Sequence, residues 1–368
     1  MFCIKPHVNY CSRAITGTVA RQFTANWRSS NIAIPCWTAA STRHFYSTGT
    51  PVRSYSSGSK VSPRDQFSSG LALNIVHKAE TMKALVYQGK HKCELEDRPI
   101  PTIQSPTDAV VKMLRTTICG TDLHILRGDV STAEPGLVLG HEGMGSVEKL
   151  GSAVTDLFVG DLVLISCITA CGVCPSCRNG LTSHCTTGGW ALGNVIDGTQ
   201  AEYVRIPHAA SSLYKLPTNI DARAAVTFSD ALPTGYECGT INANVQPGGR
   251  VAIVGSGPVG LSVLLTARLY TPSLIVVIDK DDKRLAHAAR LGADETVNTT
   301  DKEAMEKLDT LSGEHGFDSV VEAVGYPETF ELCQRLVAPG GSIANVGVHG
   351  QQAQLALDRL WDHNISEW

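Results

Sequence analysis

The chain has 368 residues, of which 43% are hydrophobic and 18% charged, and it contains 34 glycines. This composition is typical of a globular α/β chain of about two domains. It excludes a membrane span, because the most apolar long stretch, residues 251–267, is interrupted by Gly and Pro.

The N-terminal segment differs from the rest of the chain. Residues 1–64 contain no Asp or Glu but eight Lys or Arg and many Ser and Thr, a composition typical of a mitochondrial or plastid transit peptide. We therefore predict that residues 1–81 are a transit peptide, with a merely disordered extension as the alternative. The predicted location is the mitochondrial matrix, with a cytoplasmic location as the alternative.

The charge balance argues against a nucleic-acid-binding protein. Subtracting the 8 basic residues of the segment from the 31 in the chain leaves 23, against 35 acidic residues, a formal net charge of −12. Nucleic-acid binding requires a basic surface, which this remainder does not supply.

Residues 82–230 are predicted to form a small barrel-like β domain. Alternating apolar and polar residues indicate strands at 83–88, 108–115, 138–150, 160–166 and 201–206, with Gly-rich turns between them. The cysteine-rich segment 171–185 is an excursion from this domain.

Four side chains of the first domain predict an open metal site: Cys119, His141, Glu142 and Asp230. Each residue alone is weak evidence for a metal site, since a lone Cys is more often a small buried hydrophobe and a lone His-Glu pair is more often part of a solvated surface. Thiolate, imidazole and carboxylate are nevertheless the ligands that Zn²⁺ prefers, and three of them leave a fourth tetrahedral position for water or substrate. The set therefore predicts a catalytic zinc ion acting as a Lewis acid.

A second metal site is predicted in the cysteine-rich segment. Cys171, Cys174, Cys177 and Cys185 lie within fifteen residues, with two-residue gaps that let neighbouring sulfurs converge. This pattern is typical of a closed structural zinc site. A disulfide framework is the alternative, and it is disfavoured because the chain is expected to be intracellular, where disulfides are rare.

Residues 231–368 are predicted to form a doubly wound parallel sheet. Short apolar strands near residues 251, 274, 318 and 342 alternate with helical stretches such as 283–291 and 327–337. A Gly-x-Gly-x-x-Gly sequence at 255–260 follows the first of these strands and precedes a helix, which is the context of a dinucleotide-binding loop.

The second strand of this sheet indicates which dinucleotide binds. Asp279 stands at its end, where a carboxylate accepts hydrogen bonds from the ribose hydroxyls and repels a 2′-phosphate, so NAD is favoured over NADP. We assign to the cofactor site Gly255, Gly257, Pro258, Val259, Gly260, Asp279 and Arg284.

Together these motifs, in this order, resemble those of the zinc-dependent medium-chain alcohol dehydrogenases. Residues 83–364 are most similar to the branch related to secondary-alcohol dehydrogenases. The resemblance implies a GroES-like β-barrel catalytic domain at 82–230 and a Rossmann domain at 231–368, with the reaction in the cleft between them. It also implies a homodimer or homotetramer with two zinc ions per chain.

The resemblance also implies residue roles. Cys119, His141 and Asp230 match the catalytic zinc ligands, and Glu142 matches an acid able to enter the coordination sphere. Asp230 restricts the resemblance to one branch of the family, because many relatives have Cys or Glu as the third zinc ligand. Further roles follow for Thr121 and His124, which match a proton relay, and for Trp190, which matches an aromatic wall of the substrate pocket.

The predicted reaction is the reversible transfer of a hydride between a primary or secondary alcohol and NAD⁺. Zinc lowers the pKa of a bound alcohol oxygen far enough for it to ionise near neutral pH. Three alternatives stay open: a relative acting on polyols, threonine or formaldehyde; a non-catalytic descendant of such an enzyme; and a zinc-ribbon nucleic-acid module.

The C-terminal end departs from the family pattern. Relatives continue well past the segment that resembles residues 355–364, whereas this chain ends at Trp368. A doubly wound sheet usually has six strands, and the sequence predicts only about four or five of them. We therefore expect either a truncated gene model or a real product with an unfinished sheet and exposed edges.

Overall fold

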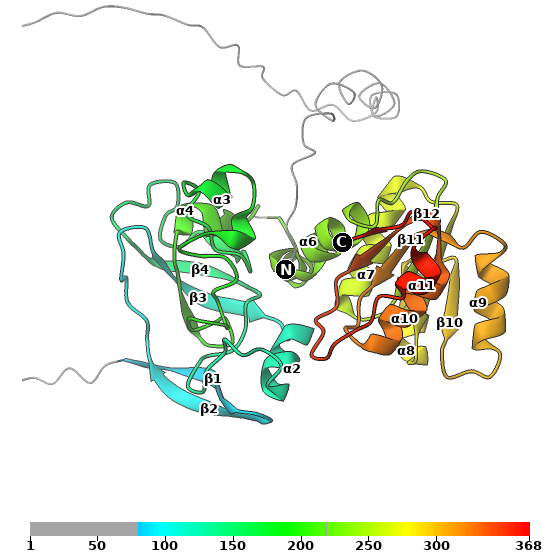
Figure 1. Cartoon of the computed structure of the whole chain (residues 1–368). Helices are drawn as coiled ribbons and strands as arrows, with labels where there is room; N and C mark the ends of the chain where they lie inside the picture. Colours follow the sequence, from blue (N-terminus) through cyan, green and yellow to red (C-terminus); the bar gives the residue numbers. More distant parts are fainter. Residues whose placement is uncertain (1–79, 218) are drawn as a thin grey trace, which may run out of the picture. The chain divides into compact units, whose positions relative to one another are not determined.

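The first part of the chain forms a barrel-like domain of antiparallel strands (Figure 1). The computed structural model describes residues 80–217 and 219–368, which fall within one compact unit. A two-stranded sheet, β1-β2, accompanies a five-stranded sheet of order β6-β3-β4-β5-β7, and single bridges from Ala84 to Ala201 and from Val86 to Val138 join β1 to the rest. The strands are β1 (Thr81–Gly89), β2 (Lys92–Pro99), β3 (Ala109–Thr116), β4 (Gly143–Leu150), β5 (Leu162–Ile165), β6 (Tyr203–Ile206) and β7 (Leu213–Lys215).

Short helices lie between these strands along the chain, and several of them carry or adjoin the candidate site residues. Before the second sheet they are α2 (Gly120–Arg127), α3 (Pro175–Arg178), η1 (Thr182–His184), α4 (Ala209–Ser212), α5 (Ala222–Ala225), η2 (Val226–Ser229), α6 (Ala231–Thr234) and the π-helical segment η3 (Gly235–Ile241). The barrel core consists of alternate residues that point inward from paired strands, such as Val111 on β3, Val147 on β4 and Val163 on β5, all nearly or fully buried.

The second part is a six-stranded parallel sheet of order β10-β9-β8-β11-β12-β13. Numbered from β8, this order is 3-2-1-4-5-6, the order of dinucleotide-binding folds. Its strands are β8 (Arg250–Val254), β9 (Leu274–Asp279), β10 (Glu295–Asn298), β11 (Phe317–Glu322), β12 (Val337–Asn345) and β13 (Ser366–Glu367). Its helices are α7 (Pro258–Ala267), η4 (Arg268–Tyr270), α8 (Asp282–Leu291), α9 (Ala304–Ser312), α10 (Pro327–Leu336) and α11 (Leu357–Leu360).

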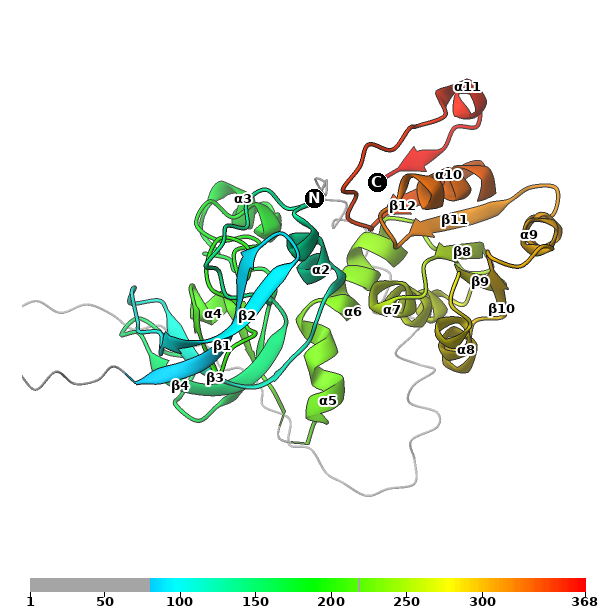
Figure 2. The ribbon, with the colours of Figure 1, turned by 90° about the horizontal axis from the view of Figure 1, so that it is seen from below.

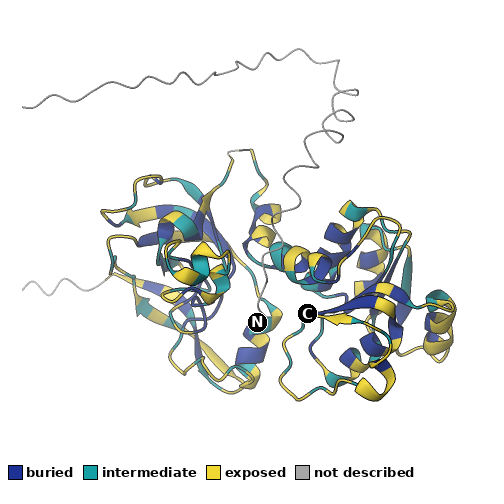
Figure 3. Ribbon diagram, turned by 45° about the horizontal axis from the view of Figure 1, so that its top comes forward, coloured by how far each residue is buried: buried dark blue, intermediate teal, exposed yellow. Residues whose placement is uncertain are grey.

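Helices cover both faces of this sheet, so its central strands are buried on both sides. One apolar cluster joins the sheet to α9 and α10 through Leu308, Phe330 and Leu336, and the other joins it to α7 and α8. Figure 2 shows α10 on one side of the sheet and α7 and α8 on the other. In Figure 3 the sheet is dark blue between its helices, which explains why β8 and β9 are continuous apolar runs.

The structure confirms the predicted α/β architecture but corrects several elements. The count of about four or five strands in the second sheet was wrong, because β10 and β13 were missed, as were β2 and β7 in the barrel. β10 and β13 lie at the two edges of the sheet and have four and two residues, too few for a recognisable apolar run. The strand predicted from residue 138 begins at Gly143.

The predicted N-terminal extension lies outside the described residues, except for residues 80 and 81, and Thr81 already begins β1. Within the described ranges, we find no helix with the length and apolarity needed to cross a membrane.

Phe317, in the apolar core of the parallel-sheet domain, provides a test of the fold. Phe317 is fully buried in the cluster that joins the sheet to α9 and α10, so Phe317→Ala should lower the free energy of unfolding by about 3–5 kcal/mol. Urea unfolding followed by circular dichroism measures this change. The matched control is Leu269→Ala, since Leu269 is 75% exposed, and a change within about 0.5 kcal/mol is expected there. Equal losses in the two variants would contradict the assigned core.

Candidate metal centre and nucleotide loop

The N-terminus of α2 positions the first of the predicted metal ligands. Cys119 directly precedes the helix, and its backbone N–H donates to Asp122 Oδ2 at 2.9 Å, which fixes the entry into the first turn. The Cys119 sulfur then lies 3.7 Å from the hydroxyl oxygen of Thr121. The helix therefore presents a thiol and a hydroxyl side by side.

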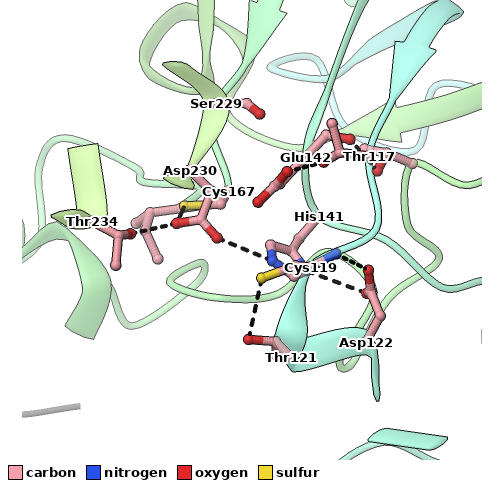
Figure 4. A network of polar contacts seen from close by, with 12 residues as sticks. Thr117, Cys119, Thr121, Asp122, His141, Glu142, Cys167, Ser229, Asp230 and Thr234 are labelled. Atoms are coloured by element: carbon pink, nitrogen blue, oxygen red, sulfur yellow. Dashed lines mark hydrogen bonds and ion pairs between the residues drawn. The ribbon is translucent and has the colours of Figure 1, made fainter. Parts of the chain in front are cut away.

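The other three side chains converge on this thiol from distant parts of the chain (Figure 4). His141 and Glu142 directly precede β4, and Asp230 lies between η2 and α6. His141 Nε2 is 3.1 Å from Asp230 Oδ2. One ligand atom from each of the four residues, Cys119, His141, Glu142 and Asp230, lies within 4.8 Å of the others, so this group could hold a metal ion.

Two of the predicted pocket and relay residues, Trp190 and Thr121, contact residues of this cluster. Trp190 lies edge to face against His141, with ring centroids 6.1 Å apart. Thr121 and His124 are three residues apart on α2, which places both on one face of the helix. The His124 ring is nearly buried, and its Nδ1 is 2.9 Å from Asp129 Oδ2.

The four cysteines of the second predicted metal site also come together. One sulfur from each lies within 4.8 Å of the others, and none of these cysteines forms a disulfide in the described chain. Backbone N–H groups already face the sulfurs: that of Cys174 donates to Cys171 Sγ at 3.3 Å, and that of Cys177 to Cys174 Sγ at 3.4 Å. The pKa values of Cys174 and Cys177 shift in opposite directions: mainly through this last bond the pKa of Cys174 is lowered to about 6, while desolvation raises the pKa of Cys177 to about 12. Cys174 is therefore the thiol of the pair that ionises first.

The glycine-rich loop joins β8 to α7, as predicted. Gly255 has a φ of 108°, and a Cβ atom at Gly260 would lie 1.8 Å from the Gly255 oxygen, so the strand and helix can approach only with glycine there. Pro258 is the first residue of α7, where its missing N–H costs no hydrogen bond. The loop leaves the sheet between β8 and β11, where the strand order reverses and where dinucleotides bind in such sheets.

Asp279 has more partners than the sequence indicated. Its carboxylate accepts hydrogen bonds from the backbone N–H of Ser256 at 2.7 Å, of Lys280 at 2.8 Å and of Asp281 at 3.0 Å. Arg284 Nη1 lies 4.0 Å from the same carboxylate. Asp279 therefore holds the end of β9 to the glycine-rich loop, in addition to any contact with a ribose.

Two family models match the chain, the alcohol dehydrogenase GroES-like domain over residues 105–218 and the zinc-binding dehydrogenase over residues 258–366. The chain belongs to the zinc-dependent medium-chain alcohol dehydrogenase family. The first matched region covers the barrel-like domain from β3 to β7, and the second covers most of the parallel-sheet domain from α7 onward. The fold is that of zinc alcohol dehydrogenases.

Relatives from this family cover most of the chain. An alcohol dehydrogenase of Cupriavidus necator is 37% identical over 310 residues, covering 77% of this chain and 82% of that protein. The solved zinc-dependent alcohol dehydrogenase 2 of Streptococcus pneumonia is 46% identical with a TM-score of 0.74, covering 78% and 82% of the two chains. A glutathione-independent formaldehyde dehydrogenase of Pseudomonas aeruginosa is 37% identical over 269 residues, covering 66% and 65%.

The structure adds four residues around the metal cluster that sequence reasoning missed. Asp122 Oδ1 lies 3.6 Å from His141 Nδ1, and Thr117 donates its hydroxyl to Glu142. Thr234 Oγ1 and Cys167 Sγ donate to Asp230 Oδ1 at 2.5 and 3.4 Å, so the other oxygen of this carboxylate faces His141. Asp122, three residues after Cys119, and Thr234, four after Asp230, could have been found from helical spacing. No local signal marks Thr117 or Cys167.

The cluster brings several acidic side chains close together around one histidine. Cys119, Asp122, Glu142 and Asp230 can all ionise to anions, and His141 is the one side chain of the five that can become a cation. Burial raises the pKa of Asp122, and burial followed by the charge of Asp230 raises the pKa of Glu142 to about 7. Burial disfavours the His141 imidazolium, but hydrogen bonds with Asp230 and Cys119 raise its pKa well above the usual value.

The raised pKa of Glu142 predicts that, in chelator-treated protein, this carboxyl lowers the free energy of unfolding to an extent that depends on pH. The unfolded chain ionises this carboxyl near its ordinary pKa of 4.5, whereas the folded chain does so near 7, so ionisation destabilises the fold increasingly between these values and by a constant amount above. Glu142→Gln should therefore raise the free energy of unfolding at pH 8 by up to about 3 kcal/mol, and the gain should vanish toward pH 5.

Urea titrations at both pH values, with EDTA present, measure this difference. The control is Glu314→Gln, an exposed position that should show the same small change at each pH. A Glu142→Gln variant that is no more stable than the parent at pH 8 would show that the carboxyl is not held in this environment.

Proposed function

We propose that this protein is an NAD-dependent zinc alcohol dehydrogenase that interconverts primary or secondary alcohols with aldehydes or ketones. The observation that supports this most directly is the convergence of Cys119, His141, Glu142 and Asp230 within 4.8 Å, beside the hydroxyl of Thr121. Two zinc ions per chain are proposed, one in this cluster and one among the four cysteines.

The residues of the cluster fit a zinc ion by their chemistry and their charge. They offer sulfur, nitrogen and oxygen donors, the three classes that zinc binds, and Asp122 lies beside the other nitrogen of His141 as the outer partner of a metal-binding imidazole does. A buried anionic group without a counter-charge is costly, and a divalent cation would compensate the three ionisable ligands around His141.

Each element of the site has a separate task. When bound, zinc polarises the oxygen of the alcohol and lowers the pKa of its hydroxyl, and the oxidised nicotinamide accepts the hydride. Thr121 can accept the hydroxyl proton at Oγ1 while giving up its own, and His124 can hold a proton at its ring. Trp190 forms an apolar wall beside His141, which restricts water at the reacting carbon.

The dinucleotide is proposed to lie along the glycine-rich loop. The first turn of α7 follows Gly257, and the backbone N–H groups of Val259 and Gly260 in it have no acceptor within the helix, which suits them to a pyrophosphate. The Asp279 carboxylate lies at the end of β9, where it repels a 2′-phosphate, and this supports NAD over NADP. Since one relative is a formaldehyde dehydrogenase, formaldehyde is the second candidate substrate.

Metal content and activity test the proposed function together. The purified chain should contain two zinc ions by mass spectrometry and should produce NADH with at least one member of a panel of ethanol, 2-butanol, a polyol, threonine and formaldehyde. Cys119→Ser should lower the metal content to one and reduce kcat/KM by about 100-fold or more, because a ligand and the charge of its thiolate are lost. Cys93→Ser is the control, since Cys93 is an exposed, unpaired thiol remote from both clusters in sequence.

Two outcomes would contradict the proposal. Activity that survives complete removal of zinc would exclude the metal mechanism. A chain that contains two zinc ions and is inactive with the whole panel would favour a non-catalytic descendant.

Cofactor preference is tested separately at Asp279. The parent should have a higher kcat/KM with NAD than with NADP, and Asp279→Asn should reduce that ratio by about tenfold, since removal of about 1.4 kcal/mol of charge repulsion corresponds to a factor of ten. Steady-state kinetics with both cofactors give the ratio, and the exposed Asp301→Asn variant should leave it unchanged. A parent that prefers NADP would refute this assignment.

A further inference from the structure

The end of α2 brings an acidic side chain back beside His124. Gly128 has a φ of 81°, in the left-handed region, and directly follows the last residue of the helix. The backbone N–H of Gly128 donates to the Ile125 oxygen at 2.9 Å, and that of Asp129 donates to the His124 oxygen at 3.0 Å. This pair of bonds is the Schellman motif, which reverses the chain direction and returns Asp129 to the turn that contains His124.

The two side chains form a defined pair. Asp129 Oδ2 lies 2.9 Å from His124 Nδ1, and the side chains are 26% and 11% exposed. In the described parts of the chain, neither the carboxylate nor the ring makes another side-chain hydrogen bond. An ionised carboxylate only accepts hydrogen bonds, so Nδ1 must have the proton, and the neutral ring then keeps its lone pair on Nε2.

The pair borders a cavity although the ring is nearly buried. A cavity of about 190 Å³ is lined by His124, Arg127 and Asp129 and by residues of two loops that follow β11 and β12. Gly350, in the second loop, approaches so closely that a Cβ atom there would lie 2.9 Å from the Asp129 carboxyl carbon. The Arg127 guanidinium donates to the Tyr326 hydroxyl oxygen at 3.2 Å rather than to Asp129, which leaves the carboxylate to the imidazole.

We propose that Asp129 is a positioning residue for the proton relay. It holds His124 in the tautomer whose Nε2 is unprotonated, so that this nitrogen can take the proton that leaves the alcohol oxygen. In that step the O–H bond breaks, an N–H bond forms at Nε2, and the hydride leaves separately to the nicotinamide. The Asp129 carboxylate stabilises the resulting imidazolium until Nε2 releases the proton to solvent. The proposal rests on the proposed alcohol oxidation.

Because of the local structure, one substitution can distinguish this positioning role from a purely structural role of Asp129. Backbone groups alone make the Schellman bonds, so Asp129→Asn preserves the helix end and the size of the side chain. The new amide can donate to Nδ1, which permits the opposite tautomer with Nε2 protonated. Only the charge and the tautomer preference are removed.

The first test does not depend on activity. Nitrogen-15 NMR of the zinc-loaded full chain, with the ring signals assigned by their loss in His124→Gln, reports which nitrogen is protonated. We expect protonated Nδ1 in the parent and a shift toward protonated Nε2 in Asp129→Asn. A parent with protonated Nε2, or ring shifts unchanged by Asp129→Asn, would overturn the proposal even if the chain oxidises alcohols.

The second test is a double-mutant cycle on kcat. Asp129→Asn should lower kcat by at least about tenfold, as expected for impaired general-base catalysis, with the KM for NAD and the zinc content unchanged. In the His124→Gln background the same substitution should change kcat by less than about twofold, because it acts through the ring. Asp301→Asn is the matched control. Equal losses in both backgrounds would show a structural role, whereas a wholly inactive parent would refute the proposed function and leave the NMR result to decide the tautomer.

Discussion

Charge compensation in the buried cluster around His141 is the constraint on which the site depends. Cys119, Glu142 and Asp230 can all become anions, and they lie near one side of the His141 imidazole. Asp122, a further acidic group, lies near the other ring nitrogen. Side chains of this kind separate unless a cation or protons hold them together. Three distant segments supply them: the entry to α2, the start of β4 and the turn before α6. Metal binding to this cluster would therefore be coupled to the packing of the whole first domain.

The two domains supply complementary chemistry. The barrel-like domain provides the candidate metal ligands, the hydroxyl of Thr121 and the His124-Asp129 pair, and the parallel sheet provides the glycine-rich loop and Asp279. A Cβ atom at Gly255 would lie 2.9 Å from the Ala323 oxygen, so the loops after β8 and β11 pack against each other where the strand order reverses. A dinucleotide at this edge and a metal in the barrel are the two components that a zinc alcohol dehydrogenase requires.

Aspartates next to element ends recur in the site. Asp122 accepts the N–H of Cys119 at the start of α2, Asp129 follows the end of α2, and Asp279 accepts N–H groups at the end of β9. Free backbone N–H groups at such ends fix the carboxylates of Asp122 and Asp279 at little entropic cost, whereas the Asp129 carboxylate is held by the His124 ring. Each fixed carboxylate is then directed at a functional group, namely the His141 ring, the His124 ring or the glycine-rich loop. Local backbone geometry thus sets the electrostatics of the proposed reaction.

The sequence by itself determined the features that depend on short-range spacing or periodicity. The four-cysteine pattern, the loop at 255–260 and the long buried strands β8 and β9 are readable because neighbouring residues specify them. Edge strands such as β10 and β13 were not readable, since they have few residues and are held by pairing with a neighbour.

Contacts between residues remote in sequence were decided only by the tertiary structure. Thr117 reaches Glu142 across 25 residues and Cys167 reaches Asp230 across 63, and no local pattern specifies such a meeting. The choice of which Asp230 oxygen faces His141 likewise depends on side-chain packing. The pairing of Asp129 with His124, only five residues apart, depends instead on the left-handed Gly128 that ends α2. Spacing identified the groups that can bind or react, and folding fixed the orientation in which they do so.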